Sequence, residues 1–506
     1  MKKLLVLSII LSIHVCIAFA DIRLPELFSN NMILQREMQV PVWGWADPGE
    51  KITVELGGHF AETVTGTDGK WKLLLGPLDA GGPFRLKITG KNTIIISNVL
   101  VGEVWVCSGQ SNMAMEVQNC LNAKQEISSA SYPQIRYFQV KRTKAIKPLD
   151  DVSPVENESG LNKWEVCDPT TVEHFTGAGY FFVRDLYKKL NVPIGIISAS
   201  WGGTTAEAWT PYDTLENDPE LKIILKNWPD YNNDEEWLKE EYEKYLKNVE
   251  KARKEGKTRP LYFNQPSVLY NGIIAPVVPY GIRGVAWYQG ESNCYRAYQY
   301  RKLFPAMIEQ WRKKWGQGNF PFLFVQLANY YFEPQNFPEL REAQSMALSL
   351  ANTAMVVTID IGDSSNIHPK NKQEVGRRLS LAARKLAYGE DLIYSGPHFK
   401  SMQIMDGKCR LSFCHIGDGL MAKGFIPLKG FIIAGTDKNF VTAQARIENN
   451  QVVVWSKVVP HPVAVRYAWA NHPGNCNLYN KSGELANLPA SPFRTDDWPG
   501  ITINRK

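Results

Sequence analysis

The sequence predicts an α/β domain between two β domains, and three observations lead to this fold class. Residues 21–100 contain short alternating strands separated by turn residues, a pattern typical of a β sandwich. Between residues 101 and 390, apolar strands alternate with helical stretches, which favours a parallel sheet covered by helices. Short alternating strands return at residues 391–506. A chain of 506 residues has room for about three domains of ~150 residues each.

Composition and charge are those of an ordinary globular protein. Hydrophobic residues make up 44% of the chain and charged residues 21%, which is enough apolar material for a sizeable core. The net charge is +6 with the two signs interspersed, so the sequence gives no support for a nucleic-acid partner. The 15 Trp and 21 Tyr suit sugar-stacking surfaces, although large β domains also bury many aromatic residues.

The first twenty residues have the three parts of a secretory signal peptide. Met1-Lys2-Lys3 is a basic start, residues 4–17 form a short apolar core, and Ala18-Phe19-Ala20 is a small-residue cleavage site. We therefore expect the mature chain to begin at Asp21 and the protein to be secreted or periplasmic. No apolar run reaches the ~18 residues needed to span a bilayer, so no membrane partner is expected.

The cysteines do not predict a disulfide framework or a zinc site. Seven of the eight cysteines follow the predicted signal peptide, and they are scattered without a Cys-x-x-Cys pair. One or two disulfides are compatible with this set, but the sequence cannot pair them. The cysteine pattern therefore gives no support for a metal site of this kind.

The elements of the N-terminal part follow from alternation and turn residues. Residues 51–56 alternate cleanly between apolar and polar side chains, as a half-buried strand does. Residues 38–42 also alternate, and Pro41 within them predicts an edge strand, because proline cannot donate a ladder hydrogen bond.

The middle part is predicted to alternate between buried strands and helices. The helix expected at residues 303–315 places Phe304, Met307, Ile308 and Trp311 on one face. An insertion at about residues 210–261 is so rich in Glu and Lys that it should contain an exposed helix. The expected strands of this part are residues 193–199, 284–287, 322–326 and 355–359, and those of the C-terminal part include residues 451–455 and 464–469.

A serine follows the first strand of the middle part. The apolar run that begins at Gly102 breaks at Gly109-Gln110-Ser111-Asn112, a turn of small and polar residues. Because ligands bind at the carboxyl ends of strands in open α/β sheets, the Ser111 hydroxyl is well placed to face a cleft. The alternative is that Ser111 only caps the following helix.

Three further turns follow later strands in the same way. Gly202-Gly203 allows the backbone to approach a ligand and to direct an N–H at it. The turn after residue 287 contains Gln289, whose amide N–H can face a negatively charged oxygen, and Glu291, which we interpret as an acceptor that holds neighbouring loops. The last turn contains His368, with acidic residues shortly before it.

These four turns together supply what acyl transfer requires. A serine hydroxyl becomes a good nucleophile when a neighbouring base accepts its proton, and the base is usually oriented by a third group. Donors placed in advance must hold the oxyanion. Ser111, His368 and an acidic residue provide the first set, and the Gly203 N–H with the Gln289 amide provides the second.

The same residues resemble those of a known family. Gly109-Gln110-Ser111-Asn112, Gly202-Gly203-Thr204, residues 289–293 and His368-Pro369 are similar to the motif blocks of SGNH/GDSL-type esterases. Residues 102–105, 269–276, 287–293 and 367–372 resemble the sialate O-acetylesterases within that superfamily. The resemblance covers about residues 21–390.

The resemblance implies a flavodoxin-like three-layer fold for the middle domain and no cofactor. It also implies an esterase that removes O-acetyl groups from sialic acid, typically at the 9-position, while some relatives act on acetylated plant polysaccharides. Ser111 and His368 would be catalytic, Gly203 and Gln289 would form the oxyanion hole, and Gln110, Asn112, Gly202 and Glu291 would support them or bind substrate. A sialate carboxylate would be matched by an arginine fork, which Arg296, Arg301 or Arg341 could supply; the alternative for each of them is a solvated surface position.

One position departs from the superfamily pattern. The aspartate usually found three residues before the histidine is replaced here by Ser365. We predict that Asp363 reaches His368 through a longer turn; otherwise a backbone carbonyl orients the imidazole and the enzyme works with a Ser–His dyad.

Two other functions are compatible with parts of the sequence. An acetylesterase for xylan or another neutral polysaccharide would need the same residues. A non-catalytic carbohydrate-binding surface protein would fit the two flanking β regions, although the intact serine, glycine pair, glutamine and histidine argue against it. The sequence gives no information on the oligomeric state.

Overall fold

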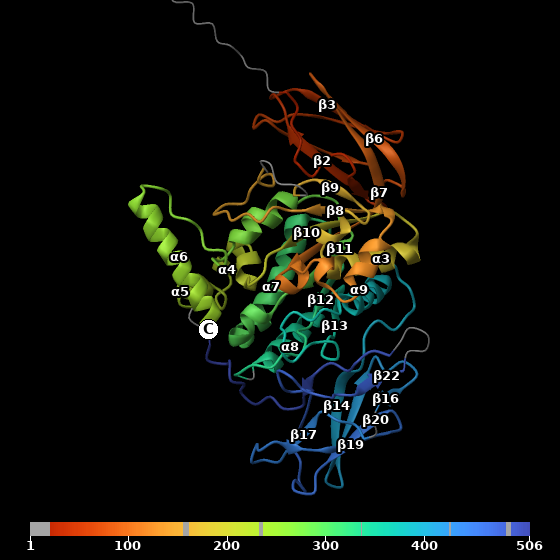
Figure 1. Cartoon of the computed structure of the whole chain (residues 1–506), viewed down its shortest axis with the longest axis vertical. Helices are drawn as coiled ribbons and strands as arrows, with labels where there is room; N and C mark the ends of the chain where they lie inside the picture. The colour runs from red at the N-terminus through yellow and green to blue at the C-terminus, as the bar shows by residue number, and fades with distance from the viewer. Residues whose placement is uncertain are drawn as a thin grey trace, which may run out of the picture.

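The computed structural model describes residues 21–154, 161–231, 236–334, 336–424, 427–481 and 487–505. The predicted signal peptide lies outside these residues. Figure 1 shows three parts along the long axis: N-terminal β strands at one end, a sheet with helices in the middle, and C-terminal β strands at the other end. The fold is thus a mixed α/β fold with a central sheet and additional β sheets.

The N-terminal part consists of antiparallel strands whose alternate side chains form its core. In β3 (Lys51–Leu56), the buried residues are Ile52, Val54 and Leu56, as the alternation predicts. Among the described strands, β2 (Val40–Trp45) pairs with β5 (Lys70–Leu75) alone, although its last residue, Trp45, also forms a bridge with Arg23. One strand partner agrees with an edge position for Pro41. The remaining strands are β1 (Ile33–Gln35), β4 (His59–Val64) and β6 (Gly81–Thr89).

A single long strand connects the N-terminal and central parts. Strand β7 (Thr93–Gly109) pairs with β6 and β1 through its first half, and with β10 and β11 through its second half. The boundary expected near residue 100 therefore falls inside a strand. The reason is that the backbone pairing continues through Val101 and Gly102 without a turn.

The central sheet has the strand order β13-β12-β11-β7-β10-β8-β9, and every neighbouring pair except β8–β9 is parallel. Its inner strands are buried on both faces, as the apolar runs in the sequence predict. Strands β8, β9 and β10 lie on one side of β7, and β11, β12 and β13 lie on the other. The direction in which successive strands are added to the sheet therefore reverses at β7. The new strands are β8 (Tyr132–Gln139), β9 (Trp164–Cys167), β10 (Ile194–Ser200), β11 (Gly284–Tyr288), β12 (Phe322–Val325) and β13 (Thr353–Val356).

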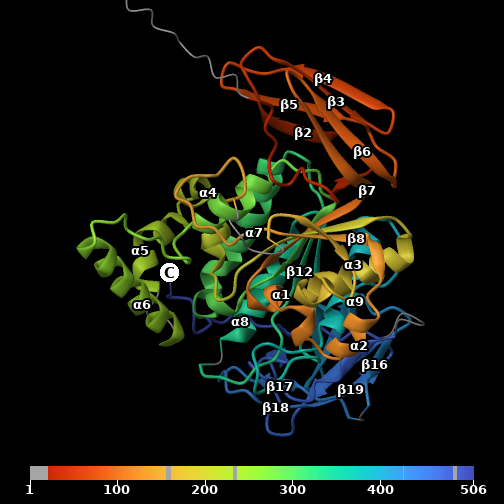
Figure 2. The same ribbon diagram turned by 45° about the horizontal axis from the view of Figure 1, so that its top comes forward.

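Helices cover both faces of this sheet. Val104 and Val106 of β7 pack in the core cluster that contains the apolar face of α7 (Ala297–Trp315). Trp105 and Cys107 point to the other face and pack with α3 (Gly177–Leu190) and α9 (Lys372–Leu386), which lie side by side (Figure 2). The other helices are α1 (Ser111–Ala114), α2 (Ala123–Ser128), α4 (Tyr212–Asn217), α5 (Lys222–Tyr231), α6 (Glu236–Lys254) and α8 (Phe337–Met346).

The C-terminal part is built from short antiparallel strands in three sheets. These are β14-β15-β20-β19, β18-β17-β21-β23 and the pair β16-β22. Strand β21 ends at Tyr467, earlier than expected, because Ala468 adopts a φ of 52°. The strands are β14 (His398–Met405), β15 (Lys408–Cys414), β16 (Leu420–Ala422), β17 (Phe431–Ala434), β18 (Val441–Thr442), β19 (Gln444–Glu448), β20 (Gln451–Trp455), β21 (Ala464–Tyr467), β22 (Leu478–Asn480) and β23 (Phe493–Arg494).

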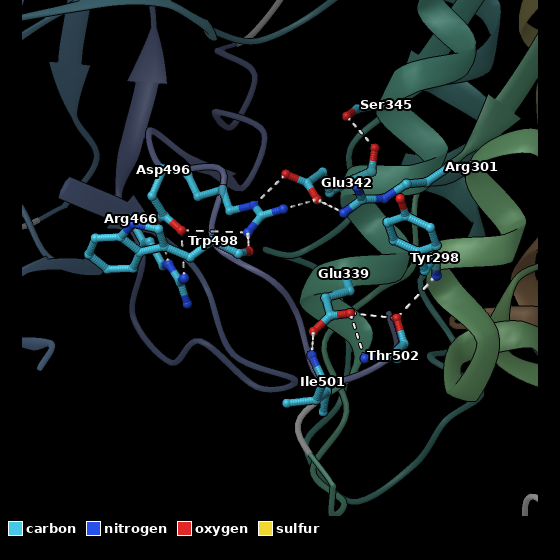
Figure 3. A network of polar contacts seen from close by, with 11 residues as sticks. Tyr298, Arg301, Glu339, Glu342, Ser345, Arg466, Asp496, Trp498, Ile501 and Thr502 are labelled. Carbon is cyan, nitrogen blue, oxygen red and sulfur yellow. Dashed lines mark hydrogen bonds and ion pairs between the residues drawn. The ribbon is translucent and has the colours of Figure 1, made fainter. Parts of the chain in front are cut away.

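Hydrogen bonds and an ion pair connect the last described residues of this part to helix α8. The Arg494 guanidinium donates to both carboxylate oxygens of Glu342, at 2.7 and 3.1 Å. The Glu339 carboxylate accepts from the N–H groups of Ile501 and Thr502, at 2.6 and 3.1 Å (Figure 3). Because Glu339 is only 6% exposed, this contact is shielded from water.

The seven cysteines of the described chain are all unpaired with one another. Over the same residues, no helix combines the length and apolar character that a membrane span requires.

Candidate active site

Ser111 and His368 meet at the carboxyl end of β7. Strand β7 ends at Gly109, whose φ is 133° and where a Cβ would lie 2.2 Å from the Tyr288 carbonyl oxygen. Only glycine fits there, so the chain turns sharply and helix α1 begins at Ser111. His368 lies on the loop between β13 and α9, and its Nε2 is 2.8 Å from the Ser111 Oγ. Ser111 therefore does not act as a side-chain cap.

The environment of His368 favours the neutral form of its imidazole. Burial lowers the pKa of His368, and the positive charge of Lys372 lowers it further. A neutral imidazole can accept a proton from a hydroxyl, which a protonated one cannot. The pair therefore has the geometry of a nucleophile beside a general base, and the lowered pKa of His368 suits that arrangement.

The predicted partner of His368 is not in contact with it, which corrects the expectation of an Asp363 triad. The Asp363 carboxylate is exposed and accepts hydrogen bonds from the N–H and hydroxyl of Ser365, at 2.9 and 2.8 Å. These hydrogen bonds lower its pKa, the backbone N–H first. Among the described residues, neither a carboxylate nor a backbone carbonyl accepts a hydrogen bond from the His368 ring.

The glycine pair lies against Ser111. A Cβ on Gly202 would be 3.3 Å from the Ser111 Cβ, and Gly203 adopts a φ of 73°, which favours glycine. Both glycines line the same cavity as Ser111. Within the described ranges, the N–H groups of Ser111 and Gly203 donate to no other residue, so both are available to an oxyanion.

Gln289 does not line this cavity, which corrects its predicted place in the oxyanion hole. It is fully buried, and its Nε2 donates to the Thr204 carbonyl oxygen at 3.0 Å and to the Asn293 Oδ1 at 2.7 Å. Its Oε1 accepts from the Tyr300 hydroxyl. Both amide hydrogens are therefore used, and Gln289 instead supports the turn that carries Gly203.

Gln110 and Glu291 join the turns that follow β7 and β11. The Gln110 Oε1 accepts from the N–H groups of Gly290 and Ser292, at 3.2 and 3.5 Å. The Glu291 Oε1 accepts from the Asn112 Nδ2 at 2.7 Å. Burial raises the pKa of Glu291, which fits a carboxyl group that holds loops together.

Lys372, the first residue of α9, also belongs to this cluster. Its Nζ donates to the Asn112 Oδ1 at 2.7 Å and to the Pro369 carbonyl oxygen at 2.8 Å. The side chain is fully buried, and burial lowers its pKa to about 8. The sequence shows Lys372 only as part of a motif after His368; a lone lysine at a helix start gives no signal that it is buried.

A cavity of about 610 Å³ opens over Ser111 and His368. Five of the fifteen lining residues are aromatic, and one of these five, Trp237, belongs to α6 of the charged insertion. The described residues that line it include Glu236 and Glu291 but no arginine or lysine. The aromatic lining residues are Trp237, Tyr295, Tyr330, Phe332 and Phe337.

The three arginines proposed for a sialate carboxylate are used elsewhere. Arg296 is buried and pairs with Glu207 at 2.6 Å, and Arg301 pairs with Glu342. Arg341 is fully buried and donates to four backbone carbonyl groups, those of Leu327, Ala328, Ala470 and Asn471. None of the three lines the cavity.

The described residues contain no group of three or more His, Cys, Asp or Glu side chains suited to a metal ion. The residues that line the cavity bring hydroxyl groups, an imidazole, carboxyl groups and an amide to it.

Known proteins resemble the chain over most of its length. The family model "Carbohydrate esterase, sialic acid-specific acetylesterase" matches residues 101–385. The sialate O-acetylesterase of Mus musculus is 32% identical over 93% of this chain and 94% of that protein, and that of Homo sapiens is 30% identical over 95% and 94%. A crystal structure of a carbohydrate acetylesterase from Xanthomonas citri has a TM-score of 0.81 and 36% identity, covering 94% of this chain and 100% of that chain.

The family model spans more than half of the sequence, including the turns that carry Ser111, Gly203 and His368. The relatives extend the similarity into both flanking β parts. The chain therefore belongs to the sialic acid-specific acetylesterase family of carbohydrate esterases.

Proposed function

We propose that this protein is a carbohydrate O-acetylesterase in which Ser111 is the nucleophile and His368 is the general base. The 2.8 Å contact between the Ser111 Oγ and the His368 Nε2 carries this proposal. Membership of the carbohydrate esterase family supports it independently. The sialate O-acetylesterases of two mammals and the carbohydrate acetylesterase of Xanthomonas citri fit the same reaction class.

The reaction proceeds through an acetyl-enzyme. His368 accepts the hydroxyl proton while the Ser111 oxygen attacks the acetyl carbonyl carbon. The N–H groups of Ser111 and Gly203 stabilise the oxyanion of the tetrahedral intermediate. His368 then gives its proton to the departing sugar oxygen, and the C–O bond to the sugar breaks. A water molecule, deprotonated by His368, attacks the acetyl-enzyme, and Ser111 leaves with that proton as acetate is released.

The catalytic pair works as a dyad in this proposal. An imidazole needs only a fixed position and an acceptor or solvent at its second nitrogen to serve as a base. The hydrogen bonds of Asp363 to Ser365 argue against a triad with that residue. Gln110 and Glu291 support the turns beside the nucleophile rather than taking part in proton transfer.

We further infer that the central part has the flavodoxin-like arrangement of SGNH hydrolases. Counting β7, β10, β11, β12 and β13 as strands one to five gives the order 2-1-3-4-5, which is the flavodoxin-like order. Ligands of such sheets bind where the order reverses, between strands one and three. Ser111 and Glu291 follow those two strands and line one cavity, which supports this inference.

Two substrate classes fit the proposed activity, and the cavity favours the neutral one. Sialic acid carries a carboxylate, which a site normally binds through an arginine or lysine. The described lining offers neither, and the exposed Glu236 at the cavity would repel an anion. Aromatic walls instead suit the apolar face of a neutral sugar, so we propose an acetylated neutral polysaccharide as substrate before sialate.

Acetate release from a panel of acetylated sugars tests both points. We expect wild-type protein to deacetylate xylan or another neutral glycan faster than 9-O-acetyl sialic acid, and Ser111→Ala to lose the activity. Ser364→Ala, at an exposed position on the His368 loop, is the matched control and should behave as wild type. Equal acetate release by wild type and Ser111→Ala would refute the catalytic proposal, and a preference for sialate would refute the substrate assignment.

We also propose that the enzyme acts after export, because the first twenty residues have the pattern of a cleaved signal peptide. Mass spectrometry of the protein from its native host tests this. The expected N-terminal residue is Asp21, and an intact Met1 on the mature protein would contradict export by this route.

A further inference from the structure

The loop that carries His368 is held on both sides of the histidine. The Asn112 Nδ2 donates to the carbonyl oxygen of Ile367 at 3.0 Å, and the Lys372 Nζ donates to that of Pro369 at 2.8 Å. The N–H of His368 itself donates to the Asn366 Oδ1 at 2.9 Å. The peptide groups around the histidine are thus fixed, although its ring has no carboxylate partner among the described residues.

The same two side chains connect this loop to the nucleophile. Asn112 follows Ser111 directly in α1, and its Oδ1 accepts from the Lys372 Nζ at 2.7 Å. Its Nδ2 donates to the Glu291 Oε1 as well as to Ile367. All hydrogen-bonding capacity of the Nδ2 is therefore used, so the amide can adopt only one orientation.

Because these contacts are buried, they are rigid and their loss is strongly destabilising. Asn112 is 1% exposed and Lys372 is fully buried. A buried ammonium group without partners is strongly destabilising, so Lys372 must keep its two acceptors. Other groups near Lys372 include the Tyr288 ring, whose centroid is 5.3 Å from the Nζ, the side chains of Cys120 and Glu291, and the His368 imidazole.

We propose that Asn112 and Lys372 are positioning residues that aim the His368 imidazole at Ser111 by holding the peptide carbonyls on either side of the histidine. They take over the orienting task that a carboxylate performs in a catalytic triad. This inference rests on the proposed serine esterase activity and adds two residues to it.

Lys372 has a second effect that separates its role from simple packing. Its positive charge lowers the pKa of His368, after burial as the larger cause. Removing that charge should raise the pKa of His368, and the acid limb of the pH profile of kcat/KM should move to higher pH. A residue that only fills space would not move this limb.

The test compares five variants, one of them a control, with wild type by acetate release, pH profile and thermal melting. Asn112→Ala and Lys372→Met each remove one of the two side chains that hold the His368 loop, and the double variant removes both. Lys372→Gln keeps an N–H donor but not the charge. Lys370→Met is the matched control, because Lys370 is exposed and its charge is not among those that shift the pKa of His368.

We expect each single anchor variant to lower kcat about 10²-fold with little change in KM, the size typical of a misplaced catalytic group. The double variant should lose about as much as a single one, because both act on one loop. The acid limb should move to higher pH in Lys372→Met and Lys372→Gln but not in Asn112→Ala or Lys370→Met.

A folded Lys372→Met with kcat within threefold of wild type would overturn the inference, as would multiplicative losses in the double variant or an unmoved acid limb in both lysine variants. If Lys372→Met does not fold, Lys372→Gln and Asn112→Ala decide the question by the same measurements. If the wild-type protein itself releases no acetate, the proposed function is refuted instead.

Discussion

Replacing Asp363 by asparagine distinguishes a Ser–His dyad from a Ser–His–Asp triad. The change removes one charge and keeps the shape of the side chain. In serine proteases, the corresponding change in a true triad lowers kcat about 10⁴-fold, because the imidazole loses its orienting acceptor. Here the carboxylate is exposed and bonded to Ser365, and an asparagine Oδ1 can still accept from the Ser365 N–H. We therefore expect kcat to fall by less than about threefold, the range of ordinary surface substitutions.

The assay is acetate release under saturating substrate, with Ser111→Ala as the measure of complete loss of chemistry. The pH profile of kcat/KM is recorded for wild type and Asp363→Asn. Because Asp363 does not touch His368, the acid limb should coincide in the two proteins.

A folded Asp363→Asn protein with a loss near 10⁴-fold would refute this reasoning. It would mean that the loop rearranges when substrate binds and brings the Asp363 carboxylate to the imidazole. Small changes would leave Asn112 and Lys372 as the residues that orient His368.

Three further predictions concern the oxyanion hole, the pH profile and the C-terminal segment. Gly203→Ala should lower kcat about 10²-fold, since its φ of 73° disfavours alanine and a displaced N–H no longer holds the oxyanion, which steady-state kinetics would show. The acid limb of wild-type kcat/KM should lie below the ordinary histidine pKa of about 6.5, since burial and Lys372 lower the pKa of His368 and activity falls once the imidazole is protonated. Glu339→Ala leaves the donors of Thr502 unpaired and should destabilise the protein by about 3 kcal/mol, seen as a lower Tm with kcat retained.

Much of the fold can be predicted from the periodicity of the sequence. The alternation of residues 51–56 and the apolar runs before Ser111, Gly202 and Gln289 correspond to β3, β7, β10 and β11. The helix expected at residues 303–315 is the later part of α7. These elements follow from which side chains are buried, and burial is what periodicity reports.

The ends of strands and their order in the sheet are harder to predict from the sequence. Strand β13 covers Thr353–Val356, whereas residues 355–359 were expected, because the apolar run continues after pairing with β12 stops at Val325. The pattern cannot show where a neighbour ends. It also cannot show that β10 and β11 lie on opposite sides of β7, which is a property of the assembled sheet.

In the site, the sequence identified turns better than hydrogen-bond partners. Ser111, Gly203 and His368 lie together as the motif pattern predicts. Gln289 was predicted in the oxyanion hole, yet Thr204 and Asn293 occupy both of its amide hydrogens. Side-chain pairing across distant turns depends on distances of a few ångströms, which residue types do not encode.

The most direct test of the central claim is covalent labelling of the nucleophile. A phosphonylating inhibitor forms a stable bond to an activated serine, and peptide mass spectrometry locates it. We expect one label per chain on Ser111 and none in Ser111→Ala, with labelling slowed when His368 is replaced by alanine. A label on another residue, or undiminished acetate release by Ser111→Ala, would contradict it.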